Sequence, residues 1–154
     1  SIMMVILNPQ AILAISIHSK CVVCNNEKKE IYVMKMTNLE IYNTASHLVE
    51  AFSDGNQKLP VKLNFFLQKN KKTLIGLAQE IEEARLNIAK EFGTENETGG
   101  YTVQPNFIDK AQAALTQLFN IEQDVDIVML TYEDLDPGMT MTAAQMEALL
   151  FMIK

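Results

Sequence analysis

The clearest pattern in the chain is a stripe of mostly apolar residues that recurs at alternating intervals of four and three. The stripe consists of Leu63, Leu67, Asn70, Leu74, Leu77, Ile81, Ala84, Ile88 and Glu91. This spacing predicts a coiled-coil-like helix over about residues 60–92, which would extend roughly 50 Å. Because that length exceeds the needs of a compact domain, we expect part of the stripe to meet another helix or another copy of the chain. The expected oligomer interface consists of Leu67, Leu74, Leu77, Ile81 and Ile88.

Two pairs of residues mark the starts of shorter helices. Thr37 with Glu40, and Thr142 with Gln145, have the spacing of a capping box, in which each side chain bonds the backbone N–H of the other residue. The first helix continues to about Phe52 through apolar residues three and four apart. The final helix is expected to direct four side chains into the core: Met146, Leu149, Leu150 and Ile153.

The segment between these helices alternates polar loops with short structured elements. Residues 93–100 are acidic and rich in glycine, which predicts an exposed loop. Residues 101–104 and 124–132 are typical of strands, and a further helix is expected from about Asn106. The sequence therefore predicts an α+β fold that is predominantly α. In it, the long central helix packs with three shorter helices and a small β element.

Residues 1–33 differ in composition from the rest of the chain. The apolar stretch over residues 2–17 is interrupted at Asn8, Pro9 and Gln10, so it is too short to cross a membrane. Lys-Glu in residues 28–30 can be encoded by a purine-rich ribosome-binding sequence shortly before Met34. One hypothesis is that residues 1–33 are a leader read through in frame, so that residues 34–154 form the single domain. The alternative is a short native strand and loop using residues 5–7 and 12–17.

The composition limits the classes of function. The chain has 154 residues, of which 48% are hydrophobic, and a formal charge of −6. This length and composition describe a globular domain, for which we expect a cytoplasmic location. The negative charge argues against general nucleic-acid binding and against anionic membranes, because phosphate groups would be repelled at long range.

Few residues are suited to catalysis or metal binding. The chain contains two His, two Cys, no Trp and one Arg. Cys21 and Cys24 supply only half of the ligands that a zinc knuckle needs. His47 lies beside an apolar stripe, where a lone histidine is more often a partly buried, hydrogen-bonded side chain than a catalyst. We therefore expect no catalytic residues, no metal and no cofactor, and a protein that is not an enzyme.

Two charged clusters could carry a binding function. Lysines gather around the start of the long helix, where a phosphorylated small molecule could bind, although a solvated face is the alternative. The candidate ligand-binding residues are Lys62, Lys69, Asn70, Lys72 and Arg85. The acidic group around Asp124, Asp126 and Asp134 lacks the ligand spacing of a calcium loop.

Several segments resemble a family of small proteins of unknown function that phages and prophages of low-GC Gram-positive bacteria carry. The resemblance covers about residues 36–153. It depends on Lys-Leu-Pro-Val-Lys-Leu-Asn-Phe at 58–65, Gln-Lys-Asn at 68–70, Ile-Glu-Glu-Ala-Arg at 81–85 and Met-Glu-Ala-Leu at 146–149. The resemblance implies an intracellular, phage-encoded accessory protein and brings no catalytic residues with it.

Two functions follow from these expectations. The first is a non-enzymatic binding protein in the infected cell, which antagonises a host defence protein or sequesters a nucleotide. Its partners would be a host or phage protein, or a phosphorylated small molecule. The alternative is a structural or assembly component of the phage particle that forms a homo-oligomer through its long helix.

Overall fold

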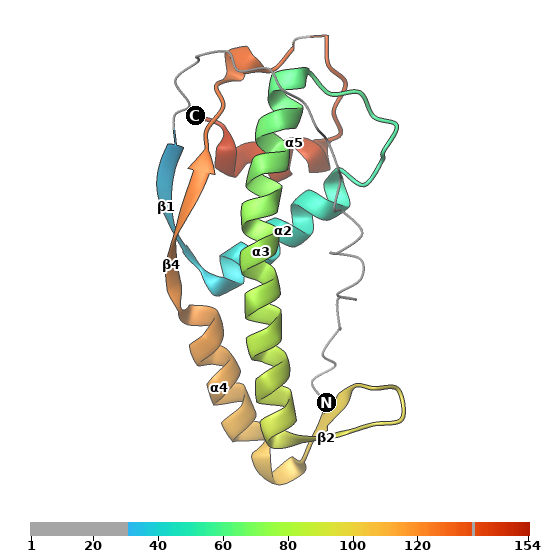
Figure 1. Ribbon diagram of the computed structural model, residues 1–154, viewed down its shortest axis with the longest axis vertical. Coiled ribbons are helices and arrows are strands. Elements are labelled where there is room, and N and C mark those ends of the chain that lie inside the picture. Colours follow the sequence, from blue (N-terminus) through green and yellow to red (C-terminus); the bar gives the residue numbers. More distant parts are fainter. Residues whose placement is uncertain (1–30, 137) are drawn as a thin grey trace.

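The computed structural model describes residues 31–136 and 138–154 of the chain. Within these ranges the fold is α+β and mainly α, as the sequence predicted. The helix α3 (Val61–Phe92) is the axis of the molecule, and the shorter helices α2 (Asn38–Ala51), α4 (Ile108–Asn120) and α5 (Ala143–Leu149) are arranged along it (Figure 1). The expectations for residues 5–7 and 12–17, and for Cys21 and Cys24, lie outside the described residues.

Both capping boxes are present and begin helices where the sequence predicted. Thr37 Oγ1 accepts from the Glu40 N–H at 3.2 Å, while the Glu40 carboxylate accepts from the Thr37 N–H at 2.8 Å. The same exchange joins Thr142 and Gln145 at the start of α5. These mutual bonds satisfy helix N–H groups that otherwise have no partner in the first turn.

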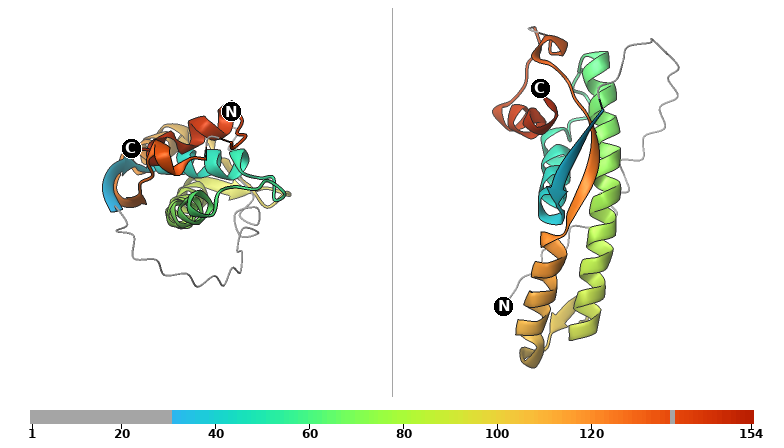
Figure 2. Two further views of the ribbon diagram at one scale, coloured as in Figure 1. Left: turned by 90° about the horizontal axis from the view of Figure 1, so that it is seen from above. Right: turned by 90° about the vertical axis from the view of Figure 1, so that its left-hand side faces the viewer.

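The long helix reaches its full length because different elements cover its two halves. At 32 residues it extends about 48 Å. Helix α2 packs on the half that begins at Val61, and α4 runs beside the half that ends at Phe92 (Figures 1 and 2). Both covering helices belong to the same chain. The length of α3 is therefore accounted for without a second copy.

Two small antiparallel sheets complete the fold. Strand β1 (Ile31–Thr37) pairs with β4 (Glu122–Val128) along all seven residues. Strands β2 (Gly93–Glu95) and β3 (Tyr101–Val103) form a hairpin at the far end of α3. Three short 3-10 turns, η1 (Pro105–Phe107), η2 (Tyr132–Asp134) and η3 (Leu150–Met152), connect or end these elements.

Strand β1 was not expected from the sequence. It starts three residues before Met34, so the expected domain boundary at that methionine falls inside a paired strand. Inward-facing Met36 is buried in the main core with Val125 and Ile127 of β4. Ile31, Tyr32 and Val33 thus belong to the described fold.

The segment after α3 is a hairpin, where the sequence predicted a loop. Gly93 is required at its start, because a Cβ there would lie 2.7 Å from the Ala89 carbonyl oxygen and 2.8 Å from that of Thr102. Gly99 has φ of +78°, a conformation that favours glycine. The turn is closed by Asn96, whose Oδ1 accepts hydrogen bonds from Thr98 and from the Gly100 N–H.

One core expectation at the C-terminus was wrong. Leu150 is exposed, while Met152 is fully buried and Leu149 lies beside it in the core. The reason is that the chain tightens from α5 into the 3-10 turn η3 after Leu149, which changes the angle between successive side chains. In the described part of the chain no helix is both long and apolar enough to span a membrane.

Candidate functional site

Lysines and apolar side chains share one exposed face at the start of α3. Val61, Phe65, Lys69 and Lys72 follow one another at intervals of four, four and three, which places them within an arc of about 80°. Val61 is 86% exposed and Phe65 is 46% exposed. We call these four residues the α3 surface. It combines apolar area with positive charge on a chain that is acidic as a whole.

One contact within the α3 surface joins Lys69 to Phe65. The Lys69 ammonium lies 5.7 Å from the centroid of the Phe65 ring, a distance at which a cation is attracted to an aromatic face. The Phe65 ring in turn packs at 5.7 Å from the ring of Phe66, which is buried. The exposed ring is thus anchored to the core through its neighbour.

Lys62 borders the α3 surface and links it to the turn η2. Its Nζ donates to Asp134 Oδ1 at 2.7 Å. Burial alone would raise the pKa of Asp134, but hydrogen bonds from Lys62 and from the backbone and hydroxyl of Thr131 outweigh burial. The pKa of Asp134 is therefore lowered from its ordinary 3.8.

This lowered pKa predicts a dependence of stability on pH. A carboxyl whose pKa is lower in the folded state stabilises the fold above the pKa of the unfolded chain, and that contribution is lost as pH falls through the folded value. We expect Asp134→Asn to remove a contribution that is full above about pH 4 and declines below it. Urea unfolding of both proteins between pH 2.5 and 7 would measure it. An equal difference between the two proteins at every pH would contradict the prediction.

Asn70 does not belong to the α3 surface, although it is adjacent to Lys69 in the sequence. Its side chain is fully buried against β4. Nδ2 donates to the Val128 carbonyl oxygen at 2.9 Å, and Oδ1 accepts from the Val128 N–H at 2.9 Å. The amide of Asn70 thus holds strand β4 on the helix. Its role here is structural, whereas the sequence had also placed it among the candidate ligand-binding residues.

Arg85 is likewise buried, about 24 Å along the helix from Lys69. Its Nε donates to Glu82 Oε2 at 2.8 Å, and its Nη2 donates to Glu82 Oε1. The hydroxyl of Tyr42 on α2 donates to the same carboxylate at 3.4 Å. Burial and the Glu82 carboxylate raise the pKa of Tyr42 above its ordinary 10.0. The structure therefore separates Arg85 from the exposed lysines and pairs it with Glu82 of the same helix, while Tyr42 links that carboxylate to α2.

Three of the five residues expected at an oligomer interface are core residues of the chain itself. Leu67, Leu74 and Ile81 are almost completely buried among side chains of the same chain. Leu77 and Ile88 are partly buried. The heptad stripe thus meets partners within the chain, and self-association stays a prediction that needs another surface.

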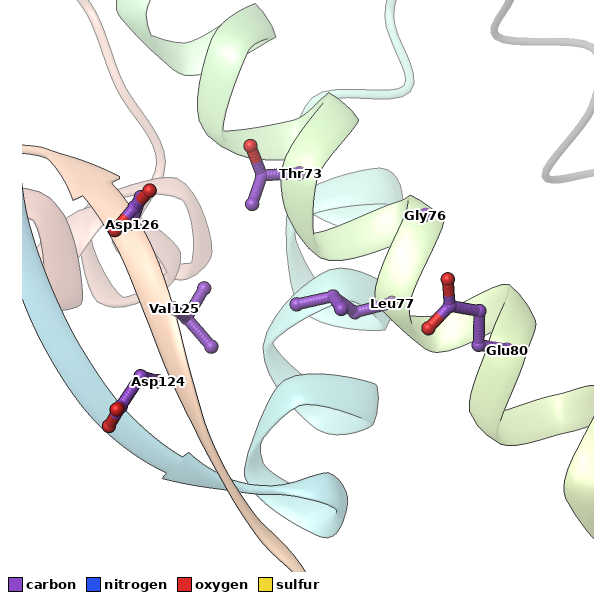
Figure 3. A pocket seen from close by; sticks show the side chains of 7 residues that line it. All are labelled: Thr73, Gly76, Leu77, Glu80, Asp124, Val125 and Asp126. Atoms are coloured by element: carbon purple, nitrogen blue, oxygen red, sulfur yellow. The ribbon is translucent and has the colours of Figure 1, made fainter.

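A shallow hollow of about 390 Å³ lies between α3 and β4. In Figure 3, Leu77 of α3 and Val125 of β4 point toward each other across it, whereas Asp124 points away from the helix. The remaining lining residues are Thr73, Gly76, Glu80 and Asp126. In the described ranges no three His, Cys, Asp or Glu side chains gather closely enough to hold a metal ion. The hollow is an open groove with an apolar floor and acidic surroundings.

Comparison with family models, curated proteins and solved structures finds no match for this chain. The resemblance to the phage family therefore stays a prediction from the sequence.

Sequence reasoning missed three residues that matter for the surface and for the core beneath it. Val61 and Phe65 carry the exposed apolar area. Both are apolar residues outside the stripe that contains Leu63 and Leu67, and this feature of the sequence could have identified them as exposed. Lys71 lies beside Lys72 in the sequence and belongs to the same run of lysines, but only 4% of it is exposed. Burial lowers the pKa of Lys71 below its ordinary 10.5.

Proposed function

We propose that this protein is a non-enzymatic accessory protein that binds another protein inside a phage-infected bacterial cell. The contact would be made by the α3 surface. The observation that carries the proposal is the position of Val61 and Phe65, two exposed apolar side chains, among the lysines of the first three turns of α3. The cytoplasmic setting follows from the proposal and from the resemblance to the phage family.

The chemistry of this surface favours a protein partner with acidic residues around an apolar depression. Full burial of a valine or phenylalanine side chain contributes about 1.5–3 kcal/mol, and aromatic residues are common anchors of interfaces. Lys69 and Lys72 would meet acidic groups at the rim, where charges govern orientation and association rate more than affinity. Because the chain has a net charge of −6, an acidic partner would be repelled by most of the molecule and attracted only to this positively charged face.

A phosphorylated small molecule has less support as the ligand. Only three of its five expected contacts, Lys62, Lys69 and Lys72, are exposed. Asn70 and Arg85 are buried and bonded to Val128 and Glu82. The exposed lysines are not among the residues that line the hollow between α3 and β4.

The alternative function, a component of the phage particle that assembles through its long helix, also has less support. Its expected interface depended on Leu67, Leu74 and Ile81, which the chain uses for its own core. A binding protein that acts through exposed residues does not need Leu67, Leu74 or Ile81 at its interface.

A photo-crosslinking experiment in cells tests the proposed function. The full chain would carry a benzophenone amino acid at position 65 and be expressed in a low-GC Gram-positive bacterium. We expect one discrete protein adduct, identified by mass spectrometry. The purified partner should then bind at least tenfold more weakly to Val61→Asp, because a carboxylate would replace the apolar anchor.

The matched control places the same photo-reactive group at position 107. Phe107 is exposed to a similar degree but lies at the other end of α3, beside the hairpin. The same adduct from both positions, or no adduct from position 65, would count against the α3 surface as the binding site.

A further inference from the structure

The backbone of β4 shows which way the strands of this sheet direct their hydrogen-bonding groups. Both the N–H and the C=O of Val128 bond the Asn70 side chain, so they point away from β1. At the other end of the sheet, the Asn38 N–H donates to the Ile121 carbonyl oxygen at 2.8 Å. That bond flanks the facing pair Thr37 and Glu122, which is the pattern of a non-hydrogen-bonded pair. Both ends of the sheet therefore give the same alternation of hydrogen-bonded and non-hydrogen-bonded pairs between β1 and β4.

The same alternation fixes the outer edge of β1. Facing pairs alternate between hydrogen-bonded and non-hydrogen-bonded, so Ile31, Val33, Lys35 and Thr37 all direct N–H and C=O away from β4. The N–H of Thr37 is satisfied by the Glu40 carboxylate. In the described part of the chain the sheet has two strands, and no third strand lies beside Ile31, Val33 and Lys35.

Within the described residues, this edge lacks the features that usually prevent strands from pairing with other chains. Natural edges are blunted by proline, by bulges or by several charges. Strand β1 has no proline, pairs one-to-one with β4 over its whole length, and carries one charge, Lys35. Its side chains add apolar area to the open backbone, because Ile31 is 56% exposed and Val33 is 65% exposed.

We propose that β1 pairs antiparallel with β1 of a second copy of this chain, about a twofold axis at Val33. The two Val33 residues then face each other, and Ile31 of each copy faces Lys35 of the other. All three are hydrogen-bonded pairs, because these residues already direct their backbone groups outward, and together they form about six hydrogen bonds. The product is a four-stranded sheet in the order β4, β1, β1, β4.

The positions of charge and apolar area favour a second copy in this orientation. In the antiparallel register the two Lys35 ammonium groups are four residues apart along the strands, about 13 Å, which exceeds the screening length at physiological salt. A parallel register would bring the two lysines side by side. Ile31 and Val33 of both copies would form one continuous apolar strip, and a symmetric contact of this kind closes after two copies.

Light scattering on the full chain tests the proposal. We expect a mass of twice 17.3 kDa at about 100 μM protein. Val33→Lys and Val33→Glu should each give a monomer with an unchanged circular dichroism spectrum, because this side chain is exposed and like charges would face each other on the axis. An equimolar mixture of the two variants should restore the dimer. Ile121→Lys, at another exposed apolar residue, should remain dimeric.

Hydrogen exchange measured by NMR on the unmodified chain provides a second readout that does not depend on the variants folding. Amides of Val33 and Lys35 should exchange at least tenfold more slowly as the concentration rises through the range of dimerisation. Amides of Tyr32 and Met34, which pair with β4, should be protected at every concentration. A monomer at all concentrations would overturn the proposal, as would a dimer that persists in Val33→Lys. Exchange rates of the Val33 and Lys35 amides that do not change with protein concentration would also overturn it. The proposal uses β1 and is independent of the α3 surface.

Discussion

Replacing Arg85 by alanine is expected to destabilise the protein by about 3–5 kcal/mol. Glu82 and Arg85 are 5% and 6% exposed, and the arginine forms two hydrogen bonds with the carboxylate. Truncation would leave the Glu82 carboxylate in the interior with only the long bond from Tyr42. Urea unfolding followed by circular dichroism at pH 7 would measure the loss.

The control for this prediction removes both charges together. The double variant Glu82→Leu, Arg85→Met should lie close to the wild type in stability, because well-packed apolar side chains often replace a buried ion pair without loss. If Arg85→Ala cost less than about 1 kcal/mol, the pair would be well solvated rather than buried.

Changing Asn70 to aspartate is expected to cost about 3 kcal/mol, since it places an unpaired charge in the interior. The new carboxylate could still accept from the Val128 N–H, but it could not donate to the Val128 carbonyl oxygen that Asn70 Nδ2 now bonds. Thermal unfolding of the variant and the wild type would give the difference. We expect that difference to shrink as pH falls toward about 4, because burial raises the pKa of the new carboxyl above its ordinary value and the protonated group can donate again.

The matched control is Asn87→Asp, which makes the same chemical change on the same helix. Asn87 is exposed, so its replacement should alter stability by less than about 0.5 kcal/mol. Equal effects at the two positions would show that the bonds between Asn70 and Val128 do not hold the sheet on the helix.

The candidate site was only partly predictable from the sequence. The cluster of lysines at the start of the long helix indicated a basic face, and Lys62, Lys69 and Lys72 are exposed there. Asn70, a polar residue of the stripe, and Arg85, in the Ile-Glu-Glu-Ala-Arg segment of the resemblance, were grouped with them. Which polar residue on a helix faces solvent depends on what packs against it, and for these two residues the packing elements are β4 and α2.

Local interactions determined what the sequence alone could establish about this protein. The two capping boxes and the spacing of apolar residues fixed where α2, α3 and α5 begin, because each signal acts within a few residues along the chain. Gly93 likewise marked the end of α3.

Tertiary structure alone decided the partners of those elements. A heptad stripe identifies the buried side of a helix but not the helix that covers it, and here α2 and α4 of the same chain do so. Strand β1 escaped prediction because its pairing with β4 joins residues about 90 positions apart, and no local pattern specifies such a register. That long-range pairing also decided which backbone groups of β1 face away from β4 and which strand lies against Asn70.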